Sequence, residues 1–253
     1  QQFSLQGSAV QTGPLTYTIT PNLLTQEGMA TNYYPVDLTQ NFTQNFQLNF
    51  GTNDGNGADG MVFMLSNTCS PVLANGGGLG VTGVPNSLIA EFDTWDNGSP
   101  NNDISNDHTG IYGDGQLNPA GNIMDASTMP VCMLTTCGNV EDGQWYDISV
   151  QWEYLSATSQ RLSVFVNGNL RATSTRNHIT ERFAGNTIVF WSIAGSTGGS
   201  SNLQQFRLIS GNNNQSYCVG QNFTLTAPSL GSNYSWTGSP STTNTASYTA
   251  TAS

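Results

Sequence analysis

Short stretches of alternating apolar and polar residues recur along most of the chain. Gly, Asn or Asp bound each stretch. Alternation with a period of two is typical of a β-strand that buries one face. The alternating apolar residues are Phe46, Leu48 and Phe50; Ile148, Val150 and Trp152; and Leu162, Val164 and Val166. The pattern therefore predicts strands that each present one face to a core.

Two further segments, residues 61–65 and 188–193, are apolar almost without interruption. Continuous apolar runs of this length suit strands that are buried between two layers. The sequence VNGN at residues 166–169 predicts a hairpin, because Asn167 and Gly168 tolerate the positive φ angles of a tight turn. Together these features predict two stacked antiparallel sheets.

Composition supports an all-β chain. Good helix formers such as Ala, Glu, Lys and Leu are scarce, whereas Gly, Asn, Thr and Ser separate short runs of β-branched and aromatic residues.

The charge is strongly acidic, with sixteen Asp and Glu against five Lys and Arg, a net charge of −11. This balance argues against nucleic acid and anionic membranes as partners. Few acids on a weakly charged chain either solvate the surface or gather around cations. Here they gather between residues 91 and 107.

The composition and the strand pattern change after about residue 210. The stretch SGNNNQS resembles a linker, and a new strand pattern follows it. We therefore expect one domain at residues 1–209, and a linker with the start of a second β module at residues 210–253. Cys218 followed by Trp236 resembles the first half of an immunoglobulin-like module, incomplete within this chain. The alternative is a tail packed on the first domain.

Four cysteines are present, without the spacing of a zinc site. Cys132 and Cys137 are expected to close a small disulfide loop, because the rest of the chain has an extracellular character. The alternative is two free thiols in a reducing compartment, and Cys69 and Cys218 have no assigned partner. No apolar run approaches the ~20 residues of a membrane span, and a start at Gln1 fits a processed chain.

The most informative stretch is EFDTWDNGSPNNDISNDH, residues 91–108. Glu91 and Asp93 alternate on one strand face, and Asn97, Asp103 and His108 follow. Calcium takes about six to eight oxygen ligands, which carboxylates, an amide and a backbone carbonyl supply together. An imidazole among them favours a transition metal beside calcium. The alternative is a solvated loop.

This stretch resembles the metal loop of the L-type (legume-like) lectins, and other segments resemble the same family in the same order. The resemblance covers roughly residues 1–209 and implies a concanavalin A-like jelly-roll sandwich. The matching segments are LQGSA at 5–9, GADGMVFML at 57–65, GGGLGV at 76–81, VEDGQWYDISVQW at 140–152 and IAGSTGGSSNLQQF at 193–206.

The resemblance implies two metal positions. Calcium would be held by Asp93, Asn97, Asp103 and the carbonyl of Trp95. A second ion, such as manganese, would be held by Glu91, Asp93, Asp103 and His108. Asp107 competes with Asp103 for this role because it also lies beside His108, but the five-residue spacing to His108 favours Asp103.

The resemblance also implies a sugar site. Asp59, following a cis peptide from Ala58, would bind sugar hydroxyls. Gly77 would offer a backbone amide, and Asn97 would donate its side-chain amide while its oxygen faces calcium. Trp95 would supply an apolar face, unless it is a core tryptophan. Residues 198–202, with Gly199 and Ser200, would form the loop that sets monosaccharide preference.

The expected function is calcium-dependent carbohydrate binding, without catalysis, by a secreted or cell-surface adhesin. The resemblance further implies an extracellular or bacterial surface location, glycans as partners and further domains of a longer chain. Export by the type IX route is our hypothesis. Two alternatives stay open. One is a structural or adhesive module with an unused sugar site. The other is a glycoside hydrolase using Glu91, Asp93 and Asp96 as ExDxxD. His178 is expected at the surface.

Overall fold

The computed structural model describes residues 2–98, 101, 103–209, 222–226 and 245–249. The chain divides into two compact units, residues 1–214 and residues 215–253. The described part of the second unit is one antiparallel strand pair, β16 (Asn222–Thr226) and β17 (Thr245–Thr249). Cys218 and Trp236 lie outside the described residues, so the immunoglobulin-like module stays a prediction.

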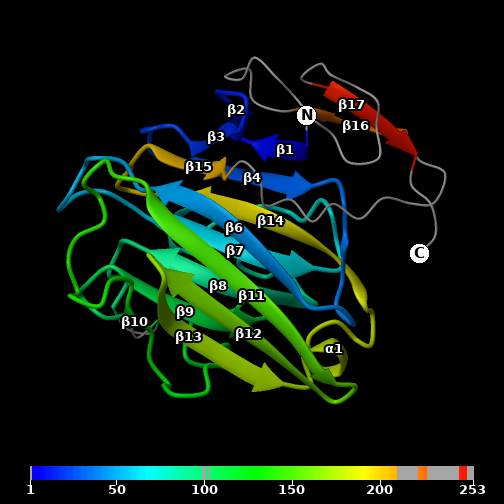
Figure 1. The fold of residues 1–253 in the computed structure, drawn as a ribbon. Coiled ribbons are helices and arrows are strands. Elements are labelled where there is room, and N and C mark those ends of the chain that lie inside the picture. Colours follow the sequence, from blue (N-terminus) through cyan, green and yellow to red (C-terminus); the bar gives the residue numbers. More distant parts are fainter. Residues whose placement is uncertain (1, 99–100, 102, 210–221, 227–244, 250–253) are drawn as a thin grey trace. The chain divides into compact units, whose positions relative to one another are not determined.

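Two antiparallel sheets build the first unit, and Figure 1 shows them as two layers. Sheet one runs in the order β1 (Phe3–Gly7), β4 (Glu27–Asn32), β14 (Ile188–Ser196), β7 (Gly60–Ser66), β8 (Ser87–Asp93), β9 (His108–Gly113) and β10 (Val131–Cys132), and β5 (Val36–Asp37) also pairs with β14. Sheet two runs in the order β13 (Asn169–Arg176), β12 (Ser159–Val166), β11 (Tyr146–Ser156), β6 (Phe42–Asn49), β15 (Gln204–Leu208), β3 (Thr16–Thr20) and β2 (Val10–Gln11). One two-residue strand therefore ends each sheet, β10 in sheet one and β2 in sheet two.

The main core lies between the two sheets. Phe46 of β6 stacks on Phe63 of β7 at 6.0 Å between ring centroids, and Phe63 in turn stacks on Trp191 of β14 at 5.9 Å. The alternating residues of β11 and β12 point into the same core, because Val150 faces Val164 in the strand register. The all-β sandwich predicted from the alternation pattern is confirmed.

A second apolar cluster covers the outer face of sheet one. Val62 and Met64 of β7 pack there with Leu79 and Val81, which follow the 3-10 turn η1 (Gly76–Gly78). Gly80 lies so close to β14 that an added Cβ would be 3.2 Å from the Cβ of Ala194. The glycine-rich segment is thus held flat on the sheet by its own apolar residues.

The one α-helix among the described residues is the single turn α1 (His178–Glu181). His178 is completely buried, and its Nε2 lies 3.0 Å from the carbonyl oxygen of Ser174. The expectation of a surface histidine was wrong, because the turn folds its first side chain inward beside Trp152. No helix within the described residues is long and apolar enough to span a membrane.

Candidate metal centre and adjoining ligand site

The β8–β9 pair places the acidic residues. In its register Asp93 lies opposite His108 and Glu91 opposite Gly110. Glu91 and Asp93 occupy alternate positions of β8, so both side chains project to the same side of the sheet. The connection between the strands then returns Asp103 to the same place.

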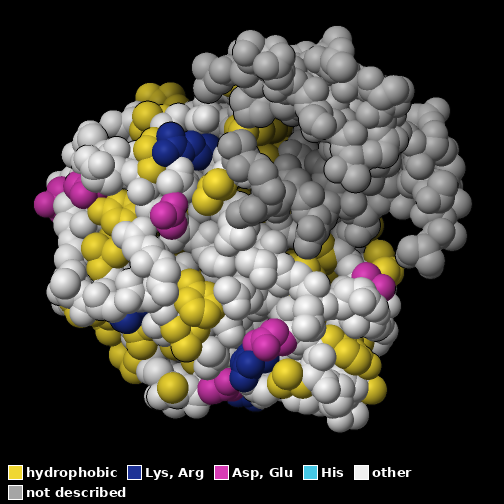
Figure 2. Space-filling view, in the orientation of Figure 1, with side chains coloured by type: hydrophobic (Ala, Val, Ile, Leu, Met, Phe, Trp, Pro, Cys, Tyr) yellow, Lys and Arg dark blue, Asp and Glu magenta, His cyan; other side chains and the backbone are white. Residues whose placement is uncertain are grey.

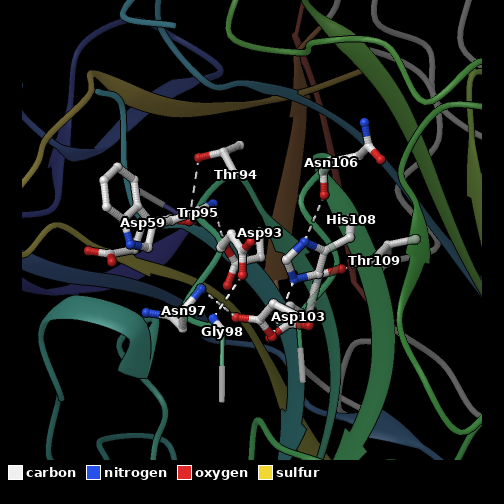
Figure 3. A network of polar contacts seen from close by, with 12 residues as sticks. Asp59, Asp93, Thr94, Trp95, Asn97, Gly98, Asp103, Asn106, His108 and Thr109 are labelled. Carbon is white, nitrogen blue, oxygen red and sulfur yellow. Dashed lines mark hydrogen bonds and ion pairs between the residues drawn. The ribbon is translucent and has the colours of Figure 1, made fainter. Parts of the chain in front are cut away.

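Asp93, Asp103 and His108 form a compact cluster. One ligand atom from each lies within 4.8 Å of the others, and His108 Nε2 is 3.6 Å from Asp103 Oδ1. Figure 3 shows these three side chains turned toward one another. The side chains of His108 and Asp103 are 1% and 5% exposed, so the cluster is shielded from solvent.

Short hydrogen bonds fix the orientation of each side chain. The backbone amide of Trp95 donates to Asp93 Oδ1 at 2.7 Å, and that of Asn97 donates to Asp103 Oδ2 at 2.9 Å. His108 Nδ1 lies 3.0 Å from the carbonyl oxygen of Asn106, which makes Nδ1 the protonated nitrogen. His108 Nε2 is therefore the ring nitrogen that a metal ion would bind.

Several buried polar atoms around this cluster have no hydrogen-bond partner within the described residues. They are Asp59 Oδ2, Glu91 Oε2, Asn97 Oδ1 and His108 Nε2. Buried polar atoms are seldom left unpaired in folded proteins. Three of these atoms, the Glu91 carboxylate oxygen, the Asn97 amide oxygen and the His108 imidazole nitrogen, are donors that a calcium ion with a neighbouring transition metal accepts. The donor set fits the metals implied by the resemblance.

The electrostatics of the cluster also favour cations. Burial raises the pKa of Glu91 to about 7 and raises the pKa of Asp93 well above its usual value. Burial lowers the pKa of His108, but the carboxylates of Asp103, 3.6 Å away, Asp93 and Glu91 outweigh this and raise that pKa to about 10. A metal ion at Nε2 would take the place of that proton. Buried carboxylates need a positive partner, and bound cations would supply it.

Asp59 reaches the neighbouring site from the loop before β7. A cis peptide joins Ala58 to Asp59, as the resemblance implies. The amide of Asp59 donates to the carbonyl of Ser196 at 3.0 Å, and its own carbonyl accepts from the amide of Thr94 at 3.0 Å. Asp59 is 5% exposed, and burial raises the pKa of its carboxyl to about 7. Asp59 is thereby tied directly to the metal loop.

Two glycines let the other loops approach. A Cβ added to Gly77 would lie 2.8 Å from Asn97 Nδ2, and one added to Gly198 would lie 3.3 Å from Asp59 Oδ2. Ser196 Oγ also donates to the carbonyl of Gly76 at 2.5 Å. The structure thus brings Asp59, Gly77 and Asn97 together from three separate segments.

The remaining predicted residues take different positions. Trp95 is half-buried and absent from both apolar clusters, so it is not a core tryptophan. Gly199 is exposed with open space around it. Ser200 is buried, and its hydroxyl donates to Asn56 Oδ1 at 3.0 Å, which gives it a supporting position under the loop.

Two competing carboxylates are occupied elsewhere. Asp107 Oδ2 accepts the amide of Val140 at 2.7 Å, which leaves Asp103 as the partner of His108. Asp96, the last residue of the hydrolase-like ExDxxD, is exposed and accepts the amide of Gly98 at 2.8 Å. Asp96 thus stabilises a turn, away from the buried Glu91 and Asp93.

The segment after β9 braces the metal loop. Cys132 and Cys137 form a disulfide, and Cys132 lies opposite His108 in the β9–β10 register. Asn106, whose carbonyl orients His108, donates its side-chain amide to the carbonyl of Cys137 at 3.3 Å. Arg171 of β13 donates to the carbonyl of Cys132 from Nη2 at 2.7 Å.

Two supporting residues were not predicted from the sequence. Asn106 orients His108, and Thr197 is buried and links the loop after β14 to residues 23–26. The polar run around Asn106 gives no signal of this role. The position of Thr197 beside the predicted specificity loop was the available hint.

Comparisons with known proteins agree with the fold. The family model described as the legume lectin beta-barrel domain matches residues 1–210. The chain belongs to the L-type lectin family. Its fold is similar to that of solved lectin structures at 20–22% sequence identity. At this identity the similarity shows the fold alone.

Three solved plant lectins illustrate the similarity. Lectin I-B4 from Griffonia simplicifolia, in a metal-free form, is 22% identical with a TM-score of 0.63, over 82% of this L-type lectin chain and 90% of the plant chain. The lectin from Bauhinia forficata in complex with GalNAc is 21% identical with a TM-score of 0.64, over 81% and 89%. Peanut lectin with a 9-mer peptide is 20% identical with a TM-score of 0.62, over 83% and 93%.

Proposed function

We propose that this L-type lectin binds carbohydrate in a calcium-dependent manner. The observation that carries the proposal is the convergence of Asp59, Gly77 and Asn97 beside a buried carboxylate and imidazole cluster with unpaired ligand atoms. Calcium would be held by Asp93, Asp103, Asn97 Oδ1 and the carbonyl of Trp95. A second ion would be held by Glu91, Asp93, Asp103 and His108.

The chain's own residues then have separate tasks. When bound, calcium would supply a positive centre that neutralises the carboxylates and fixes the loop. With Asn97 Oδ1 turned to the ion, Nδ2, which lies beside Gly77, would donate to a sugar hydroxyl. Asp59 Oδ2, buried and unpaired, would accept from another hydroxyl. Trp95 would cover the apolar face of the ring.

A glycan array measured with calcium and with a chelator tests this proposal. Galactose and N-acetylgalactosamine are the first ligands to include, because similar lectins were solved with methyl-α-D-galactose and with GalNAc. We expect binding with calcium and none with the chelator. Absence of binding in both conditions would favour the alternative of a structural module with an unused sugar site.

We further propose that the lectin acts outside the cell, as a bacterial surface adhesin that attaches to glycans. The Cys132–Cys137 disulfide supports this location, because such bonds persist mainly in oxidising compartments. Antibody labelling of intact cells, lost after brief protease treatment, is the expected result. Labelling only after lysis would contradict the location without touching the sugar site.

A further inference from the structure

The loop at residues 21–26 is fastened to the predicted specificity loop. Thr197 Oγ1 donates to the carbonyl of Leu23 at 2.6 Å and accepts from the amide of Gln26 at 2.9 Å. The amide of Thr25 donates to the carbonyl of Gly198 at 3.1 Å. The two loops therefore form one unit, although more than 170 residues separate them in sequence.

Thr25 adopts an unusual backbone conformation in this loop. Its φ is 54°, a left-handed value that β-branched residues rarely take. Such conformations persist only where the surroundings enforce them, and they are frequent at ligand sites. Here the bonds to Thr197 and Gly198 enforce it.

This loop turns two leucines outward. Leu23 is 60% exposed and Leu24 is 57% exposed. Leu203, at 39%, lies at the same end, because the next residue, Gln204, pairs with Thr20 just before the loop. Single exposed apolar residues are ordinary on protein surfaces, but a group beside a polar site is typical of ligand contacts.

The leucines adjoin the proposed sugar site through Gly198. Its carbonyl accepts from Thr25, and its α-carbon lies against Asp59, as an added Cβ would be 3.3 Å from Asp59 Oδ2. Leu24 directly precedes Thr25, the residue that is bonded to Gly198. A group attached to a sugar held by Asp59 would therefore lie next to the loop that carries the leucines.

We infer that Leu23 and Leu24 form an apolar subsite for the group linked to the bound sugar. The ligand class is glycans whose linked unit or aglycone presents aliphatic carbon, such as an alkyl chain or a methyl-bearing sugar. This inference rests on the proposed function, since it needs a sugar at Asp59. Leucine side chains offer contact area but no hydrogen bonds, so the subsite would add affinity with little demand on stereochemistry.

Titration calorimetry in calcium with methyl and hexyl glycosides of galactose, N-acetylgalactosamine, mannose and glucose tests the inference. For the sugar that binds, we expect the hexyl glycoside to bind roughly 4- to 15-fold tighter than the methyl glycoside, as burial of one or two methylene groups would give. The double variant Leu23→Ser/Leu24→Ser should bring this ratio close to one while keeping the affinity for the methyl glycoside.

The matched control is Leu155→Ser/Leu170→Ser, which removes two leucines that are 50% and 51% exposed on sheet two. This control should keep the ratio. The subsite alone would be overturned if the ratio of hexyl to methyl glycoside affinity were near one in the unaltered protein. It would also be overturned if the Leu23/Leu24 variant kept the ratio of the unaltered protein. Binding of no glycoside at all would overturn the proposed function as well.

Discussion

At the residue scale, the unpaired buried atoms are what distinguish this site from an ordinary acidic loop. Glu91 Oε2, Asn97 Oδ1 and His108 Nε2 are each buried without a hydrogen-bond partner among the described residues. A solvated loop would leave such groups in water. Their burial instead fits the proposed metal ions, which accept both oxygen and nitrogen donors.

Asp103→Asn should weaken calcium binding roughly 100-fold, because it removes one negative charge and one ligand oxygen from a buried site. Titration calorimetry measures this directly. The control is Asp96→Asn, the same change in the same loop at an exposed turn position. Equal calcium affinities in the two variants would exclude Asp103 as a ligand.

Gly77→Ala should weaken glycan binding at least about 10-fold, because the new Cβ would lie 2.8 Å from Asn97 Nδ2 and displace that amide. Gly13→Ala, whose Cβ would meet nothing closer than 3.3 Å, serves as the control. Glycan affinity is measured on the array hit with saturating calcium. Unchanged affinity in Gly77→Ala would show that Asn97 does not contact the ligand.

At the element scale, the strand register explains why part of the site was predictable. Alternation on β8 indicated that Glu91 and Asp93 share a face, and the β8–β9 pair then brings His108 opposite Asp93. The role of Thr197 was not predictable, because it depends on a contact with Gln26, 171 residues away in sequence. The role of Asn106 was not predictable for another reason: it orients His108 through its backbone carbonyl, which no side-chain pattern indicates. Recognition of Asp59 and Gly77 came from the family resemblance rather than from periodicity.

The disulfide segment should support the metal loop. Replacing Cys132 and Cys137 with Ser should lower the free energy of unfolding by about 2 kcal/mol, the loop-closure value for so short a ring. Calcium affinity should fall as well, since Cys132 pairs with His108 and Cys137 binds Asn106. Chemical unfolding and calorimetry measure the two effects. A loss of stability with unchanged calcium affinity would show that the brace does not reach the metal site.

The helical turn α1 should make stability depend on pH. Burial lowers the pKa of His178 in the folded state, so between that value and the unfolded value of about 6.5 the unfolded chain binds more protons. The stability that the neutral His178 contributes is therefore fully present above about pH 6.5. It falls as the pH drops below that value.

The variant His178→Phe removes this titration, at the cost of the bond to Ser174. Melting temperatures measured from pH 7.5 to 5 in saturating calcium should fall more steeply for the unaltered protein than for the variant. Parallel curves would show that His178 does not contribute.

At the scale of the whole molecule, the sandwich could be predicted almost entirely from alternation, turn residues and composition. The outer apolar cluster could not, because Leu79 and Val81 follow a run of glycines that resembles an exposed loop. The surface in Figure 2 shows acidic and basic side chains as small separate groups, with no broad basic patch on the face drawn.

Calcium should stabilise the whole first unit, because by our proposal it would bind the folded loops and not the unfolded chain. At 100 times its Kd it would add about 2.7 kcal/mol, which corresponds to about 5–10 °C in Tm for a domain of this size. Differential scanning calorimetry with calcium and with chelator measures the shift. Asp103→Asn should show little of it, and equal melting temperatures in both conditions would contradict the metal site.

The two-residue end strands bear on how copies of the lectin behave when crowded. An exposed sheet edge is a template for strand addition by a neighbour, and short edge strands limit that risk. β10, closed by its disulfide, and β2 each offer only two residues for such pairing. The long edge strand β13 is instead partly covered, because the amide of Asp125 donates to the carbonyl of Thr173 and Asp125 Oδ1 accepts from the amide of Thr175. Many copies can therefore stand side by side at these edges without aggregating through their sheets.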